Sequence, residues 1–175
     1  MGIERSKRPV AVSRITTTAR RLLDASTLCA IATADRNGRA HINTAYFAWS
    51  PDFHLAWLSE PGARHSRNIR ANESVAIAVY DSAQMWGKPD RGIQIFGTAE
   101  EVVRSASDDA EKLYAARFPE YHGTKLSAYR FYVLRPQRIK LFDEREFGTG
   151  VFVTARLARS GRLVWERTEI YRPAA

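Results

Sequence analysis

Apolar residues recur along the chain at two different periods, and the change of period predicts where helices and strands lie. Ile15, Ala19 and Leu22 are spaced as on one face of a helix, which predicts an amphipathic helix over about 13–25. The segments that follow either alternate in polarity or are wholly apolar, as β-strands are. The predicted strands span about 28–34, 40–49, 53–58, 74–80, 92–103, 129–134 and 138–142.

Turn and capping residues separate these strands. The segment 35–38 ends in Asn-Gly and predicts a hairpin, because both residues tolerate a positive φ. Ser59 is a favoured N-cap and a proline follows it closely, which predicts a short helix to about residue 71. Ser105 with Asp108 resembles a capping box and predicts a second short helix.

The order of these elements favours a mainly β fold with peripheral helices. Many short antiparallel strands indicate a closed or nearly closed barrel, since closure removes exposed strand edges. Two further strand-like runs within 151–171 flank a Ser-Gly pair and predict a C-terminal hairpin. A chain of 175 residues is long enough for one core but short for two ordinary domains.

Four segments in this order resemble the pyridoxamine 5′-phosphate oxidase-like, FMN-binding split-barrel family. They are LCAIAT at 28–33, AHINTAYF at 40–47, SEPGARHSRNIR at 59–70 and GIQIFGTAE at 92–100. The resemblance implies a six-stranded antiparallel split β-barrel of Greek-key type. It also implies a homodimer with the cofactor at the two-fold interface. We therefore expect a basic arm over 1–12, a cofactor-binding barrel domain over 13–147 and a C-terminal strand hairpin over 148–175.

The segment after Ser59 favours a phosphate site on physical grounds. A helix N-terminus offers free N–H groups and a positive dipole end, and Arg64, His65 and Arg67 fall near its start. The family resemblance implies that Arg64 and His65 hold the cofactor phosphate, with Ser59, Arg67 and Asn68 beside them. Many relatives have Arg-Lys where this chain has Arg64-His65. Because histidine is mostly uncharged at neutral pH, this chain carries less positive charge at the site than those relatives do. A solvated basic helix face is the alternative interpretation.

The strand over 40–49 is the second candidate part of the site. Period-two alternation places His41, Asn43 and Ala45 on one face and Thr44 on the other. The resemblance implies that residues of this strand line the flavin ring. The residues alone leave open which face does so, or whether the polar face simply meets solvent.

Two residues elsewhere in the chain complete the candidate cofactor site. Gln94 lies between apolar neighbours and resembles a glutamine that some relatives place near the ring; a polar side chain there needs a partner. Trp86, in the loop 81–91, could cover a bound ring or pack on its own domain.

Charge and composition reduce the classes of binding partner that this chain is expected to have. The formal net charge of +8 calls for an anionic partner, but the arginines are spread along the chain and form no basic tail, so nucleic acid is not expected. The single cysteine, Cys29, excludes an internal disulfide. No apolar stretch is long enough to span a bilayer and no secretory signal is evident, so we expect a cytoplasmic protein without a membrane partner. The four histidines lack metal-site spacing, and no metal is expected.

Motifs for a serine hydrolase, a dinucleotide fold or a P-loop are absent, and no catalytic residue can be named. The absence of a catalytic motif is compatible with a reaction in which a bound cofactor, and not a side chain, carries out the chemistry. The leading hypothesis is an FMN-binding oxidoreductase that transfers two electrons between a small organic substrate and flavin. Alternatives are a reductase that uses the deazaflavin F420, a haem protein with His41, His54 or His65 as axial ligand, and a non-catalytic flavin-binding protein. Trp165 and Arg167 match the C-terminal motif of authentic pyridoxamine phosphate oxidases only loosely.

Overall fold

The computed structural model describes residues 2–102, 107–122 and 128–172. Helices in this part of the chain are α1 (Val12–Asp24), α2 (Arg64–Ala71), α3 (Ser107–Arg117) and α4 (Glu144–Phe147). The strands are β1 (Gly2–Ser6), β2 (Leu28–Ala34), β3 (Ala40–Trp49), β4 (Leu55–Ser59), β5 (Ser74–Tyr80), β6 (Arg91–Glu101), β7 (Arg130–Asp143), β8 (Val151–Leu157) and β9 (Leu163–Arg172).

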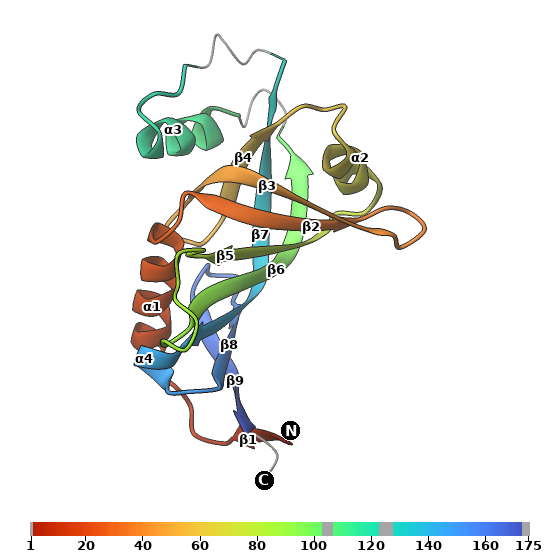
Figure 1. Cartoon of the computed structure of the whole chain (residues 1–175). Helices are drawn as coiled ribbons and strands as arrows, with labels where there is room; N and C mark the ends of the chain where they lie inside the picture. The colour runs from red at the N-terminus through yellow and green to blue at the C-terminus, as the bar shows by residue number, and fades with distance from the viewer. Residues whose placement is uncertain (1, 103–106, 123–127, 173–175) are drawn as a thin grey trace. The chain divides into compact units, whose positions relative to one another are not determined.

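The described strands form a sheet that closes on itself. Their hydrogen-bonded order is β1-β9-β8-β7-β4-β3-β2-β5-β6, and β6 also pairs with β7 (Figure 1). Six strands, β2 to β7, therefore make a closed ring, while β8, β9 and β1 extend the sheet beyond β7. The predicted six-stranded antiparallel barrel with a C-terminal hairpin is confirmed, and β1 is a strand that the sequence pattern did not reveal.

Backbone contacts divide the chain into two compact units, and three strands run through both. The first unit comprises Met1–Ser26, Ala78–Ile95 and Gln137–Ala175, and the second comprises Thr27–Ile77 and Phe96–Pro136. Each unit is described separately below.

The first unit contains α1 and the extended end of the sheet. The apolar stripe of α1 buries Ile15, Ala19 and Leu23, and the helix contacts β9. The fully buried carboxylate of Asp143 caps α4 by accepting from two backbone N–H groups, and it also pairs with Arg21 at 3.0 Å. A buried charge needs such partners, so Asp143 fixes α1 and α4 to the end of β7.

The second unit contains the β2–β3 hairpin, β4 and the helices α2 and α3. Strand β2 pairs with β3 from Leu28↔Tyr46 to Ala34↔Ala40. Strand β4 pairs with the first half of β7, and the buried rings of Trp57 and Tyr132 stack across that pair at 5.8 Å. Helix α2 contacts β2 and β3, and α3 contacts β3 and β4.

Two predicted boundaries were wrong for identifiable reasons. Ser59 does not cap a helix: it ends β4 opposite Arg130, and a turn closed by Ala63 N–H to Glu60 O (3.0 Å) precedes α2. The predicted strands 129–134 and 138–142 form one strand, β7, which passes through the buried Pro136.

The proline in β7 lies where the strand changes neighbours. Residues before it pair with β4 up to Leu134, and residues after it pair with β8 from Arg138. The missing N–H of proline therefore falls between the two ladders. The capping residue Ser105 lies outside the described residues, so that prediction is not tested.

Candidate functional site

The end of β4, the start of α2 and the middle of β3 enclose a cavity of about 380 Å³, which we name the α2 cavity. All of its lining residues belong to the second unit. They are Asn43, Thr44, Ala45, Tyr46, Leu58, Ser59, Glu60, Ala63, His65, Tyr114 and Tyr129. Five of them, namely Asn43, Thr44, Ala45, Ser59 and His65, are residues that the sequence predicted for the cofactor site.

A chain of neutral hydrogen bonds lines one side of this cavity. The Oγ of Ser59 lies 2.6 Å from Nε2 of His65, and Ser66 Oγ donates to the carbonyl of Glu60 at 2.8 Å. Burial lowers the pKa of His65, and the nearby His41 lowers it further. A neutral imidazole can accept the Ser59 proton at Nε2, so this wall of the cavity carries no charge near neutral pH.

The structure settles which face of β3 meets α2. The rings of His41 and His65 are nearly parallel, 6° apart, with centroids 6.3 Å from each other. His41, Asn43 and Ala45 are partly buried, whereas Ile42 and Tyr46 on the opposite face are 66% and 56% exposed. His41 therefore faces α2, while Thr44 and Tyr46 from the other face of β3 also line the α2 cavity.

Three more predicted residues lie on α2 with different surroundings. Asn68 is buried and its Nδ2 donates to Thr33 Oγ1 at 3.0 Å, so it fixes α2 to β2. Arg67 is exposed and donates to the carbonyl of Gly62. Arg64 is exposed at the first helical position, and its charge contributes, after the backbone N–H of Arg39, to lowering the pKa of Asp35. None of the three is among the residues that line the α2 cavity, so their predicted roles stay predictions.

The far end of α2 is also held in place. Arg70 donates to Glu101 Oε2 at 3.0 Å and to the carbonyl of Pro61, and Tyr132 donates to the same carboxylate oxygen. These contacts set the position of the helix over β2 and β3. The cavity wall is thus built on a helix anchored at both ends.

Two aromatic residues that line the cavity, Tyr114 and Tyr129, were not predicted from the sequence. Tyr114 is on α3 and is mostly buried, which raises the pKa of its hydroxyl. Tyr129 directly precedes β7. No motif marks either residue, because each reaches the cavity from an element distant in sequence from β3 and α2.

The remaining predicted residues, Trp86 and Gln94, belong to the first unit. The Trp86 side chain is fully exposed, at 100%, in a loop whose base is fixed by Gln84, which both accepts from and donates to the backbone of Arg91. Gln94 lies in β6 and is partly buried between Ile93 and Ile95. The structure does not place them with the α2 cavity, so their predicted roles stay predictions.

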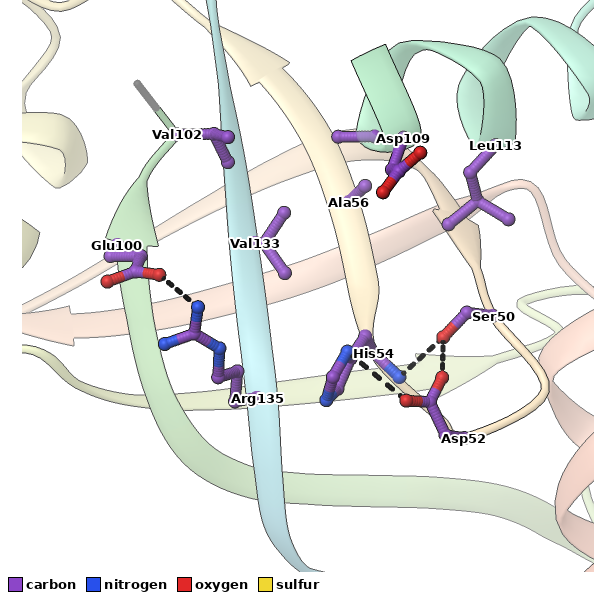
Figure 2. Close-up of a pocket in the computed structure, with 11 residues that line it drawn as sticks. Ser50, Asp52, His54, Ala56, Glu100, Val102, Asp109, Leu113, Val133 and Arg135 are labelled. Carbon is purple, nitrogen blue, oxygen red and sulfur yellow. Dashed lines mark hydrogen bonds and ion pairs between the residues drawn. The ribbon is translucent and has the colours of Figure 1, made fainter. Parts of the chain in front are cut away.

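A second hollow in the second unit, of about 340 Å³, lies between α3 and the sheet, and we name it the α3 pocket. Its lining residues come from the β3–β4 turn, β4, β6, α3 and β7. They are Ser50, Asp52, His54, Ala56, Glu100, Val102, Asp109, Ala110, Leu113, Val133 and Arg135 (Figure 2).

Ion pairs ring the α3 pocket above an apolar floor. Arg135 pairs with Glu100 at 2.6 Å, and His54 Nδ1 lies 3.5 Å from Asp52. Figure 2 shows these two pairs on opposite sides of the pocket, with Ser50 bonded to Asp52. The side chains of Arg135, Glu100, His54 and Asp52 are all substantially exposed, so both contacts meet water.

The sequence that forms the barrel matches one protein family. A family model described as Pyridoxamine 5'-phosphate oxidase matches residues 15–143, which include β2 to β7 and α2. The chain belongs to this family. The resemblance seen in four sequence segments is thereby confirmed. A search of curated proteins finds no sequence that matches the chain.

Solved structures share the fold at low sequence identity. A protein of Clostridium acetobutylicum related to general stress protein 26 is 13% identical with a TM-score of 0.64, over 85% of this chain and 97% of that one. A heme binding protein from Mycobacterium smegmatis is 19% identical with a TM-score of 0.63, over 86% of this chain and 60% of that one. HutZ, the heme storage protein of Vibrio cholerae, is 20% identical with a TM-score of 0.59, over 67% and 87%.

Three further features concern the described residues alone. None of their helices has the length and apolar character needed to cross a membrane. No three of their histidine, cysteine or acidic side chains gather as a metal ion would require. Cys29 is buried, which raises the pKa of its thiol to about 12, so it remains protonated.

Proposed function

We propose that this protein is an FMN-binding oxidoreductase that transfers two electrons between a small organic substrate and flavin. The observation that carries the proposal is the α2 cavity, in which Asn43, Ser59 and His65 converge beside the first turn of α2. Membership of the pyridoxamine 5'-phosphate oxidase family supports it.

The start of α2 fits the phosphate of a flavin, although Arg64 is not among the side chains that line the α2 cavity. Arg64 supplies a positive charge at the first position of the eight-residue helix α2, whose N-terminus favours anions. His65 adds hydrogen-bonding capacity but little charge near neutral pH, because burial lowers its pKa. Arg64 therefore carries most of the charge that would hold the phosphate.

Bound flavin would supply the electron-transfer chemistry, and the chain's own residues would bind and orient it. Ser59 and His65 would offer neutral hydrogen-bonding groups, and the aromatic rings of Tyr114 and Tyr129 would contribute apolar surface, while Glu60 also lines the cavity. Such a cavity needs no nucleophile of its own, which agrees with the lack of a nucleophile motif in the sequence.

We also propose that the protein is a homodimer, on the basis of the exposed face of the β2–β3 hairpin. The register places Leu28 opposite Tyr46 and Ala32 opposite Ile42, and all four side chains are exposed. Apolar side chains gathered on one sheet face mark a contact surface more often than a solvated one. Sedimentation equilibrium would test this: a dimer is expected for the wild type, and a monomer for an Ala32→Lys, Ile42→Lys variant. A monomeric wild type would contradict it.

Haem is a second candidate, because two structurally similar proteins are named for haem. A neutral imidazole such as that of His65 is what iron requires. Its Nε2, however, is already engaged by Ser59 at 2.6 Å, so iron ligation through that atom would break a buried hydrogen bond. This contact favours flavin over haem in the α2 cavity.

The decisive experiment compares cofactors on one preparation. Purified protein is titrated with FMN, F420 and haem, and binding is followed by fluorescence or absorbance. We expect FMN to bind, and Arg64→Ala to weaken it about tenfold to a hundredfold, the effect of losing a charge-assisted contact. Arg159→Ala is the matched control, because Arg159 is exposed in the β8–β9 turn of the first unit. Preferred binding of F420 or haem would replace the proposal, and binding of none would reject it.

A further inference from the structure

The α3 pocket is a second hollow that the proposed function does not use. It shares no lining residue with the α2 cavity, although both hollows lie in the second unit. Its volume of about 340 Å³ is at the small end of the range for ligand sites in proteins. A ligand of this pocket would therefore be a small molecule.

The floor of the α3 pocket is apolar and built from small side chains. Ala56 on β4 and Ala110 on α3 are buried, at 1% and 6% exposure, and belong to one hydrophobic cluster. Val133 lies opposite Ala56 in the β4–β7 ladder, and Val133 and Leu113 are only partly buried against that cluster. Apolar surface is thus left open in the hollow, and the apolar part of a ligand would remove it from water.

The charged groups around this floor differ in how they are satisfied. Arg135 pairs with Glu100 at 2.6 Å, and Asp52 lies 3.5 Å from His54. Asp109, in the first turn of α3, has neither a hydrogen bond nor an ion pair to another described residue, and its side chain is exposed. Figure 2 shows its carboxylate on the α3 side of the pocket, away from the Glu100–Arg135 pair. Asp109 therefore offers a negative charge that the rest of the pocket leaves unpaired.

The sign of the charge in the pocket is opposite to that of the whole chain. The lining has three carboxylates and one guanidinium, a formal charge of −2 with histidine counted as neutral, whereas the chain carries +8. A local excess of negative charge attracts cations and repels anions. The floor requires an apolar body, so the two properties together specify a cation with an apolar body.

We infer that the α3 pocket binds a small amine whose apolar body covers the floor and whose ammonium group faces Asp109. This site is separate from the α2 cavity and does not depend on the proposed function. Because the rim is exposed to water, the ammonium adds selectivity more than affinity, and that selectivity is sensitive to salt.

Asp109 also has a role in the fold that does not involve a ligand. A carboxylate in the first turn of a helix interacts favourably with the helix dipole. A purely structural Asp109 would affect the stability of the protein but would not affect which ligand the pocket prefers. The test therefore measures ligand preference.

Three probes that share a phenylethyl body are titrated into the protein at low salt: 2-phenylethylamine, which is a cation, 2-phenylethanol, which is neutral, and 3-phenylpropionate, which is an anion. Binding is followed by the shifts of backbone amide signals in NMR spectra. Asp109→Asn removes the charge at constant size, and Val133→Phe fills the floor. Glu120→Gln is the matched control, because Glu120 is an exposed carboxylate of the second unit that does not line the pocket.

We expect the amine to bind the wild type about threefold more tightly than the alcohol, the size of effect that an exposed charge pair produces. The carboxylate should bind most weakly. Asp109→Asn should remove most of the preference for the amine, Glu120→Gln should retain it, and about 1 M salt should abolish it. Val133→Phe should weaken all three probes about tenfold or more, since the ring occupies their place.

Equal binding of the amine and the alcohol by the wild type, or an unchanged preference in Asp109→Asn, would overturn the inference. Binding that survives Val133→Phe would place the probes elsewhere and would overturn it too. If Val133→Phe does not fold, the amide signals of Ala56, Ala110 and Leu113 decide, and their failure to shift counts against the site. No cofactor is present in these titrations, so their outcome leaves the proposed function of the α2 cavity unaffected.

Discussion

The α2 cavity and the α3 pocket are of similar size, about 380 and 340 Å³, but they are built in opposite ways. The wall of the α2 cavity is made of buried, neutral hydrogen bonds among Ser59, His65 and Ser66. The rim of the α3 pocket is made of ion pairs such as Glu100–Arg135, whose side chains are 53% and 61% exposed. The hydrogen bonds beside the first hollow are buried, whereas the ion pair at the second is exposed to water.

This difference indicates in which of the two hollows one hydrogen bond to a ligand would contribute most to binding. Hydrogen bonds strengthen where water is excluded, and an unmet group there is expensive. Exposed ion pairs are screened by water and salt, and each is worth little. The buried hydrogen bonds beside the α2 cavity can therefore discriminate between ligands, whereas the Glu100–Arg135 pair of the α3 pocket is screened by water.

The largest expected effect concerns the backbone behind the rim of the α3 pocket. Gly97 in β6 approaches β7 so closely that a Cβ would lie 2.1 Å from the carbonyl oxygen of Arg135. Backbone cannot move aside as a side chain can, so Gly97→Ala should destabilise the protein by about 3 kcal/mol or more. Urea unfolding measures the change. Gly62→Ala is the control, because nothing lies within 4 Å of its Cβ position; equal stability of the two variants would refute the prediction.

The next effect tests whether the hydrogen bonds around the α2 cavity support the fold. Asn68→Ala removes the buried bond to Thr33 and leaves the threonine hydroxyl without its donor. We expect the free energy of unfolding to fall by about 2 kcal/mol. The neighbouring Arg67→Ala changes an exposed side chain and should stay within about 0.5 kcal/mol. Equal losses of stability in the two variants would mean that the buried Asn68 hydrogen bond contributes no more than the exposed Arg67 side chain does.

Much of the fold could be predicted from the sequence, because its signals are local. The strands at 28–34, 40–49 and 74–80 were predicted with the bounds that the structure has, since alternation and turn residues define them. The start of α2 was misplaced because Ser59 looks like an N-cap but is held in the β4–β7 ladder. Long-range pairing overrode a local preference.

The site was only partly predictable for the same reason. His41, Asn43 and His65 stand in segments whose order is characteristic of the family, so they could be named. That His65 is neutral and bonded to Ser59, and that Asn43 lacks a donor, depends on packing among three elements. Tyr114 and Tyr129 reach the cavity only through tertiary folding, which no spacing in the sequence reveals.

A smaller effect should appear in the pH dependence of stability. Burial, with a further contribution from His41, lowers the pKa of His65 below its ordinary value of 6.5. As the pH falls below about 6.5, His65 is protonated more readily in the unfolded chain than in the folded protein. The free energy of unfolding therefore decreases over this range. Unfolding free energies of the wild type and His65→Gln are compared between about pH 7.5 and 5. The wild type should lose more stability over this range; parallel curves would show that His65 titrates as in the unfolded chain.

The smallest effect is expected at the rim of the α3 pocket. Glu100→Gln removes the charge that faces Arg135 at 2.6 Å, yet both side chains remain in water. The coupling energy from a double-mutant cycle with Arg135→Gln should therefore be at most about 0.5 kcal/mol at low salt and should vanish near 1 M salt. Urea unfolding of the four proteins at both salt concentrations supplies the measurement. A coupling above about 1.5 kcal/mol that resists salt would show that the rim is shielded from water, and the contrast between the two hollows would then have to be abandoned.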